Sequence, residues 1–221
     1  MTYNIRGGWG MDGGWSTERI GEVVLEQAPD ILCLQEVHQR LPQSRFVDQP
    51  GRLQKALGLP VVFQPNLRLG VGAYGLAIVS RYPVNAVQNH LLPSVREQRG
   101  ALEVNLTTPA GPLTVFCTHW GLNGAERERQ AARLAELVQA VSGPVLVCGD
   151  FNEGPTAPGV SALRARTLLA DADADKDRLT YPADAPAARI DYVLYSPELA
   201  LQEAFPVNSL ASDHLPLIAD F

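Results

Sequence analysis

The stretch PVLVCGDFN at residues 144–152 decides how the chain folds. Its four consecutive apolar residues, VLVC at 145–148, are typical of a strand that is buried on both faces. The run ends in Gly149, Asp150 and Asn152, and glycine lets the backbone turn or approach another group closely. Asp150 and Asn152 are two residues apart, so in extended chain their side chains point to the same side. We therefore expect a rigid sheet with a polar, functional edge.

Eight further apolar runs predict strands on either side of this one. Several of them alternate apolar and polar residues, as ALEVNL does at 101–106, which suits a sheet with one face in a core. The runs cover residues 30–36, 59–64, 75–82, 84–92, 100–106, 113–119, 189–196 and 215–221. Strands outnumber helices, and we expect two β-sheets packed face to face with helices outside.

Two amphipathic helices are predicted between the strands. The first follows GWSTERIGEVVLEQA at 14–28, where Ser16 is the expected N-cap and Pro29 ends the helix. The second is GAERERQAARLAELVQAV at 124–141, whose Ala, Leu and Val residues recur at helical spacing. A weaker helix is predicted at 157–166, and a surface loop at 170–188.

Length and composition favour a single domain over residues 1–221, with 46% apolar residues to form its core. No apolar run approaches the roughly 18 residues of a transmembrane helix, and MTYNIRGGWG lacks the features of a secretory signal. The 18 Lys and Arg against 24 Asp and Glu give a net charge of −6. This balance disfavours long-range attraction of the whole chain to nucleic acid or anionic membranes, but leaves room for a local basic patch.

The three cysteines, Cys33, Cys117 and Cys148, each lie within an apolar strand-like run. Their spacing fits neither a zinc finger nor a disulfide framework. We interpret them as reduced core residues, and expect a monomer located in the cytoplasm. His38 and His90 match no pattern and are expected at the surface.

Polar residues gather at the ends of the predicted strands. Strand ends are where a rigid scaffold can hold such groups together at one rim. The residues concerned are Asn4, Glu36, His119, Asp150 with Asn152, Asp191, and the pair Asp213–His214. Six such endings predict one common site.

The types of residue in this set narrow the chemistry. Glu36, Asp213 and Asn4 offer hard oxygen ligands, which favour Mg²⁺ or Mn²⁺ over zinc. The chain has no H-E-x-x-H helix, no close Cys/His cluster and no G-x-S-x-G elbow. Ser212, Asp213 and His214 are contiguous, which is the wrong arrangement for a catalytic triad, because neighbours on a strand point apart.

Seven motifs in this order resemble the endonuclease/exonuclease/phosphatase family of DNase I-like phosphoesterases. They are TYNIR, DILCLQEV, GLAIVSRYPV, FCTHWGLN, VCGDFNEGP, RIDYVLYS and SDHLPL, and they span nearly the whole chain. The resemblance implies an α/β (α+β) fold, a four-layer sandwich of two mixed β-sheets with helices on the outside. It also implies an enzyme that depends on Mg²⁺ or Mn²⁺ and hydrolyses a phosphate-ester substrate by in-line attack of water.

The resemblance assigns the residues around the ion and the attacking water. Glu36 corresponds to the principal metal ligand, with Asn4 and Asp213 close to the ion. Asp150 and Asn152 would position or activate the water.

The resemblance also assigns the residues around the phosphate. Asp191 would orient His214, His119 would bind the phosphate or stabilise its developing charge, and Arg99 would contact the phosphate. The roles of Arg6 and Tyr74, which lie beside motif segments, stay open. GAYGLAIV at 72–79 lacks the glutamate that DNase-like members pair with a histidine, which disfavours a mechanism with two His–carboxylate pairs.

Several functions are compatible with this set. THWGLNGAERERQ at 118–130 looks like the small phosphodiesterase and sphingomyelinase-like members, and together with the acidic charge it favours a small or lipid-derived phosphodiester or phosphomonoester. The alternative is a DNA-repair endonuclease or exonuclease. A non-catalytic binding module is disfavoured because every metal and proton-transfer position holds a competent side chain.

Overall fold

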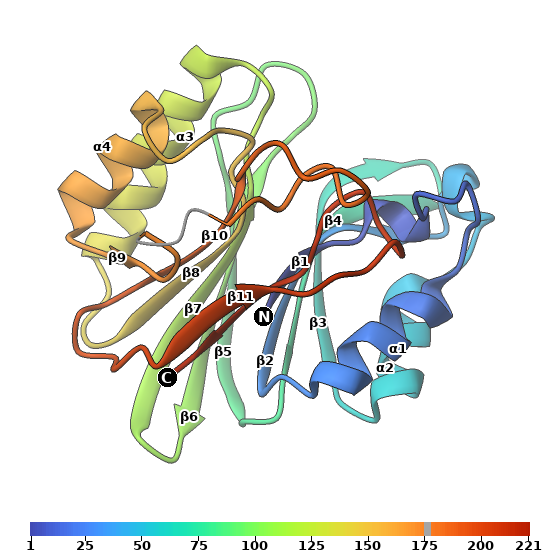
Figure 1. Cartoon of the computed structure of the whole chain (residues 1–221), viewed down its shortest axis with the longest axis horizontal. Coiled ribbons are helices and arrows are strands. Elements are labelled where there is room, and N and C mark those ends of the chain that lie inside the picture. The colour runs from blue at the N-terminus through green and yellow to red at the C-terminus, as the bar shows by residue number, and fades with distance from the viewer. Residues whose placement is uncertain (175–177) are drawn as a thin grey trace.

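The computed structural model describes residues 1–174 and 178–221 and shows four layers, as expected (Figure 1). The first sheet has the strand order β11 (Glu203–Pro206), β12 (Leu217–Asp220), β1 (Thr2–Asn4), β2 (Ile31–Gln39), β4 (Gly72–Ser80) and β3 (Val61–Leu69). The second has the order β5 (Val84–Leu91), β6 (Gly100–Thr108), β7 (Gly111–His119), β8 (Val145–Asp150), β10 (Asp191–Tyr195) and β9 (Ala170–Asp171). Both sheets are mixed, because β1–β2 and β7–β8 pair in parallel and their neighbours pair antiparallel.

Helices cover the outer face of each sheet. In Figure 1, α1 (Thr17–Gln27) and α2 (Gln49–Leu57) lie outside the first sheet, and α3 (Gly124–Gln139) and α4 (Pro158–Thr167) outside the second. Two short 3₁₀ turns, Arg6–Gly8 and Pro42–Ser44, follow β1 and β2. None of the helices in the described part of the chain is both long and apolar enough to cross a lipid bilayer.

The predicted helices form where their capping signals stand. The Ser16 hydroxyl accepts a hydrogen bond from the Arg19 amide at the start of α1, and Asn123 accepts one from Glu126 at the start of α3. Helix α2 was not predicted, because its residues QPGRLQKAL contain few apolar positions. Its signals are Asp48, which caps the helix, and Pro50 in the first turn.

Some strand boundaries differ from the predictions. Strand β2 does not end at Glu36 but continues to Gln39, and β12 begins only at Leu217. Strand β11 was not predicted, and the short edge strand β9 lies within the segment predicted as a loop at 170–188. Residues 175–177 of that segment lie outside the described residues.

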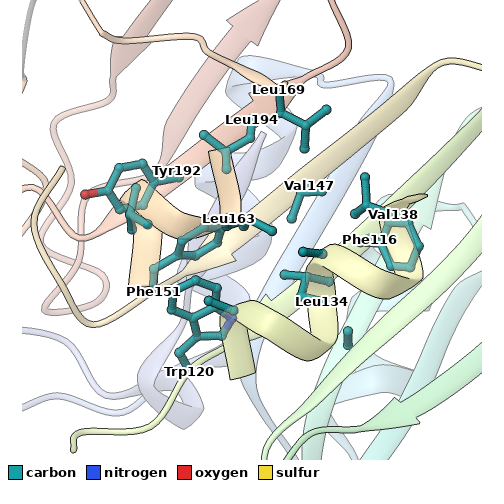
Figure 2. Packing of buried hydrophobic residues seen from close by; sticks show 14 of the residues in the cluster. Phe116, Trp120, Leu134, Val138, Val147, Phe151, Leu163, Leu169, Tyr192 and Leu194 are labelled. Carbon is teal, nitrogen blue, oxygen red and sulfur yellow. The ribbon is translucent and has the colours of Figure 1, made fainter. Parts of the chain in front are cut away.

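Aromatic residues fix the ends of β7 and β8 against the outer helices. Trp120 directly follows β7, Phe151 directly follows β8, and both are fully buried. The rings of Trp120 and Phe151 stack with centroids 4.4 Å apart, and Phe151 lies 4.9 Å from Tyr192 (Figure 2). Close-packed aromatic side chains leave these strand ends little freedom to move. The residues next to them in sequence, His119 and Asp150, are therefore held rigidly.

The three cysteines lie where the sequence placed them. Cys33, Cys117 and Cys148 are free and buried in the core between the two sheets. The hydrogen bond with Cys33, together with burial, raises the pKa of the Cys148 thiol well above its usual value. They serve as packing residues.

The two histidines expected at the surface are covered. The side chain of His90 is 17% exposed and lies 2.7 Å from the Glu103 carboxylate. His38 is 9% exposed, and its ring packs near Tyr74. The Gln49 side chain, at the start of α2, accepts a hydrogen bond from the His38 amide and donates one to the Gly7 carbonyl. The Gly7 backbone lies against the His38 ring, since a Cβ at Gly7 would collide with it. The helix that was not predicted holds this Gly7 turn in place through Gln49.

We expect His38 to make folding less favourable in weak acid. Burial lowers the pKa of His38 from 6.5 to about 4, so between these values the unfolded chain binds a proton that the folded chain does not. The free energy of unfolding then falls as the pH falls, by about 2 kcal/mol between pH 7 and pH 5 for this group. Urea unfolding of the wild type and of His38→Gln should show this difference in pH dependence. Equal dependence in both proteins would contradict the prediction.

Candidate active site

The register of three neighbouring strands, β7, β8 and β10, brings their ends together at one end of the second sheet. His119 and Asp150 end the parallel strands β7 and β8 and are paired in register. Asp191 begins β10 and pairs with Asp150 from the other side. Residues in register on neighbouring strands have adjacent side chains, so these three groups meet although 72 residues separate the first from the last in sequence, from His119 to Asp191.

The first sheet contributes Asn4 and Glu36 to the same place. Glu36 lies in a β-bulge, where the register with β4 shifts between Leu34 and Val37, and its φ is 56°. A bulge turns a side chain away from the regular alternation of a strand. Glu36 thereby reaches the site from within β2, and not from the strand end that the sequence predicted.

Asn4 joins the two sheets. Its amide nitrogen donates to Glu36 Oε1 at 3.1 Å and to Asp150 Oδ2 at 2.9 Å. Its amide oxygen accepts a hydrogen bond from the Arg6 backbone N–H at 3.0 Å, which fixes the orientation of the amide. Asn4 thus holds the two carboxylates in place and directs its oxygen to the backbone.

Asp150 is the centre of the site. Its Oδ2 lies 3.4 Å from His119 Nε2 and 3.6 Å from His214 Nε2, and its Oδ1 accepts the Asn152 backbone N–H at 2.9 Å. Burial, together with the charge of Asp191, raises the pKa of Asp150 to about 7. A carboxylate with a pKa near neutrality is suited to accept a proton during a reaction.

His214 and Asp191 form a buried hydrogen-bonded pair. His214 Nδ1 donates to Asp191 Oδ2 at 2.9 Å. Burial opposes the charged imidazolium, but the charge and hydrogen bond of Asp191 and the charge of Asp150 outweigh it and raise the pKa of His214 to about 10. The Tyr181 ring lies 4.8 Å from the His214 ring. His214 is therefore protonated, and its positive charge lies beside the Asp150 carboxylate.

His119 has a different environment. Arg99 donates to its Nδ1 at 2.8 Å, and the Tyr74 hydroxyl lies 3.3 Å from the same nitrogen. Burial lowers the pKa of His119 well below its usual value, and the Arg99 charge acts in the same direction. His119 is therefore a neutral imidazole beside a guanidinium.

Asn152 lies beside the other nitrogen of the His119 ring. The chain leaves β8 after Asp150, and Asn152 adopts a left-handed φ of 52°. Its amide nitrogen donates to the Trp120 carbonyl at 2.9 Å and lies 3.1 Å from His119 Nε2. Asp150 and Asn152 thus both reach His119, through a turn and not through the alternation of an extended strand.

Asp213 lies at the more open side of the site. Its carboxylate forms an ion pair with Arg6 at 3.3 Å, and the neighbouring Ser212 hydroxyl donates to the Asn4 carbonyl at 2.7 Å. Burial raises the pKa of Glu36, the Asn4 hydrogen bond opposes this, and the nearby charge of Asp213 adds to the rise.

The structure brings all nine predicted site residues to one place. Eight are joined by the contacts above, and Asp213 connects through Ser212 and Arg6. Three participants had no assigned role: Tyr74, Arg6 and Ser212. Tyr74 lies in the segment 72–79 that lacks the DNase-like glutamate, and its hydroxyl lies 3.3 Å from His119 Nδ1. Ser212 could be recognised only once Asn4 was known to lie beside it.

The donor groups of the site fit a divalent cation. Single ligand atoms of Asp150, Asp191 and His214 lie within 4.8 Å of one another. Among the described residues, Asp191 Oδ1 is buried without a hydrogen-bond partner. Glu36 lies beside this group and shares the Asn4 amide with Asp150. Two of the buried carboxylates, Asp150 and Glu36, have raised pKa values, and a bound cation would stabilise their charged forms.

Comparison with known proteins agrees with this arrangement. The chain is 28% identical to the uncharacterized protein YbhP of Escherichia coli (strain K12) over 244 residues, which covers 100% of this chain and 94% of YbhP. The fold matches the mannosyl-6-phosphatase Bt3783 of Bacteroides thetaiotaomicron with a TM-score of 0.81 at 19% identity, covering 100% of this chain and 98% of that one. It also matches the human Nocturnin catalytic domain with a TM-score of 0.73 at 25% identity, covering 92% and 84%.

The sequence also matches a family profile over most of its length. Residues 1–214 match the Endonuclease/Exonuclease/phosphatase family. The matched range contains the whole site from Asn4 to His214, and the family resemblance predicted from the seven motifs is confirmed. The chain belongs to the endonuclease/exonuclease/phosphatase family.

Proposed function

We propose that the chain is a divalent-metal-dependent phosphoesterase that hydrolyses a phosphodiester or phosphomonoester of a small or lipid-derived molecule by in-line attack of water. Members of the family are generally hydrolases that act on phosphate esters and depend on a divalent metal. The observation that carries the proposal is the environment of Asp150. This carboxylate, with a pKa of about 7, lies between a neutral His119 and a positively charged His214.

The protein groups have complementary parts in such a reaction. Asp150, held by Asn4 and oriented with Asn152, accepts a proton from the attacking water as its oxygen bonds to phosphorus. Arg99 and His119 bind the phosphoryl oxygens, on which negative charge is spread in the transition state. His214, oriented by Asp191, is a protonated group that can stabilise this charge and supply a proton to the departing oxygen.

The divalent ion would be held beside Glu36 and Asp213. Bound there, it would supply Lewis-acid stabilisation of the phosphoryl oxygen and lower the pKa of water. Asp191 Oδ1 is a further candidate ligand, because it is buried without a hydrogen-bond partner in the part of the chain that the structure describes, while Oδ2 accepts the His214 hydrogen bond. Asn4 has a positioning part, since its amide N–H groups face the carboxylates.

Removal of the metal tests the proposal. Hydrolysis of bis-p-nitrophenyl phosphate with Mg²⁺ or Mn²⁺ should be abolished by EDTA and restored by added metal. Glu36→Gln should need a much higher Mn²⁺ concentration, and calorimetry should show weaker Mn²⁺ binding, since one negative ligand is lost. The exposed Glu22→Gln is the matched control. Activity that persists in EDTA, or unchanged Mn²⁺ affinity in Glu36→Gln, would refute the metal assignment. Preference for an abasic oligonucleotide would favour the nuclease alternative.

A further inference from the structure

Three loops at the active-site end each place an exposed apolar side chain near an exposed arginine. The loop after β2 has Arg45 and Phe46, the β3–β4 hairpin has Arg68 and Val71, and the loop between β5 and β6 has Val95 and Arg96. The exposed fractions are 62% for Phe46, 82% for Val71 and 68% for Val95. We call these six residues the rim.

The three loops are neighbours in space. A side chain at Gly72, in the hairpin, would come within 2.7 Å of the Arg40 carbonyl, so the hairpin packs against the loop after β2. A side chain at Gly100 would collide with Asn66 of β3, so the loop before β6 adjoins the same hairpin. Gly100 also pairs in register with His119. The rim residues therefore come from three adjoining segments, one of which leads into the strand paired with His119. These segments lie at the end of the sandwich where β4 and its hairpin lie in Figure 1.

The backbone of the loop after β2 holds its two rim residues in an unfavourable conformation. Arg45 and Phe46 both have left-handed φ angles, of 56° and 59°. Non-glycine residues avoid this region, and where they occupy it the strain often serves a function. The Arg45 guanidinium lies over the Trp15 ring at 5.3 Å, which orders it. The backbone N–H groups of Arg45 and Phe46 donate to the carbonyls of Pro42 and Leu41, both at 2.9 Å, and so close the preceding 3₁₀ turn. This turn holds the Phe46 side chain 62% exposed.

The rim has a charge opposite to that of the whole protein. The chain carries a net charge of −6, yet the rim carries three exposed arginines. Among residues 1–174 and 178–221, no ion pair joins Arg45, Arg68 or Arg96 to an acid. Glu97 is engaged by Arg99, and Asp48 caps α2. The local basic patch that the composition left open therefore lies here.

We propose that the rim docks the protein on the surface of an anionic lipid bilayer, so that the active site meets phosphate esters presented by that surface; this rests on the function proposed above and names the source of its substrate. Arginines are attracted to anionic headgroups, while Phe46 and the valines enter the boundary between headgroups and acyl chains. Nucleic acid would match the arginines but not the valines, because unstacked bases are bound by aromatic and guanidinium planes. The combination of three arginines with aliphatic side chains fits a lipid surface better.

Vesicle binding tests the proposal without relying on catalysis. Co-sedimentation in EDTA would compare vesicles of phosphatidylcholine with those containing roughly 30% phosphatidylserine, a content that gives the surface a marked negative potential. We expect binding to the anionic vesicles only, weakened by high salt. Two double variants, Phe46→Ser with Val71→Ser and Arg45→Gln with Arg68→Gln, should each bind at least ten times more weakly. Leu168→Ser with Arg166→Gln, at the end of α4, is the matched control and should bind like the wild type.

The possible outcomes separate the two proposals. Both rim variants should hydrolyse soluble bis-p-nitrophenyl phosphate at the wild-type rate, because none of the four residues contacts the site. A metal-dependent hydrolase that ignores anionic vesicles, or whose rim variants bind as the wild type does, would overturn the docking proposal alone. A protein that binds vesicles through the rim but hydrolyses no phosphate ester would overturn the proposed function alone. Tighter binding to a single-stranded oligonucleotide, lost only in the arginine variant, would assign the rim to nucleic acid.

Discussion

Asp150→Asn should lower kcat by about 10²–10⁴-fold, the range expected when a positioned proton-transfer group is lost. The amide is nearly the same size as the carboxylate but cannot accept the water's proton at neutral pH. It also ends the attraction between Asp150 and His214 across 3.6 Å. Single-turnover hydrolysis of bis-p-nitrophenyl phosphate at saturating Mn²⁺ measures this loss at the chemical step.

Stability distinguishes a catalytic from a structural part for Asp150. Burial and the charge of Asp191 raise its pKa, which means that the fold disfavours its charged form. Above the folded-state pKa, the neutral amide removes this unfavourable charge. This gain offsets the loss of one of the two hydrogen bonds that the carboxylate accepts from Asn4 and from the Asn152 N–H, so the thermal midpoint at pH 8 in EDTA should change little. A variant that loses both activity and several degrees of thermal stability would indicate that Asp150 mainly supports the fold.

His214→Ala should lower kcat by at least roughly 10²-fold. Asp191→Asn should also lower kcat, because the loss of the Asp191 charge acts on His214. Asp191 acts by holding the His214 ring through a 2.9 Å hydrogen bond and by favouring its protonated form. Groups that act as a unit give strongly non-additive losses when both are changed. The double variant should therefore be about as slow as His214→Ala alone.

The pH profile gives a second test of this pair. If Asp191 sustains the imidazolium, Asp191→Asn should move the loss of activity in alkali to lower pH, whereas damage to packing alone would leave the profile in place. Multiplied losses in the double variant, or a His214→Ala enzyme close to the wild-type rate, would contradict the assigned part of His214. Tyr195→Phe, at the far end of β10 from Asp191, is a suitable control.

Most of the fold could be predicted because the strands and three of the helices have clear local signals, namely apolar runs, helical spacing of apolar residues and helix caps. The VLVC run indicates a buried strand, the Ser16 cap indicates the start of a helix, and the apolar stripe of α3 indicates a helix with one buried face. The second 3₁₀ turn and α2 have no such signal. The α2 sequence QPGRLQKAL is mostly polar, and the helix is stabilised by the Asp48 cap and by hydrogen bonds of Gln49 with backbone groups far away in sequence. His38 was misplaced because its ring is covered by Gly7 and Tyr74, which are far from it in sequence.

The site was predictable to the level of residue identity but not of geometry. Asp150, Asp191 and His119 follow from strand ends that meet in register. Glu36 could be named from its motif, yet its side chain reaches the site only because β2 bulges, and a bulge has no signature in this run. The amide direction of Asn4 and the pairing of Tyr74 with His119 depend on contacts between segments far apart in sequence, which periodicity cannot supply.

The Ser212 hydroxyl donates a hydrogen bond to the Asn4 carbonyl, 208 positions away in sequence. This long separation has a consequence for synthesis of the chain. A ribosome releases Asn4 early and His214 late, and domains acquire their structure as the chain emerges. A partly translated chain lacks the Asp191–His214 pair and the hydrogen bond from Ser212 to the Asn4 carbonyl. If the proposed function holds, a nascent chain would gain hydrolytic activity only after residues 212–214 have left the exit tunnel and joined Asn4 and Asp191.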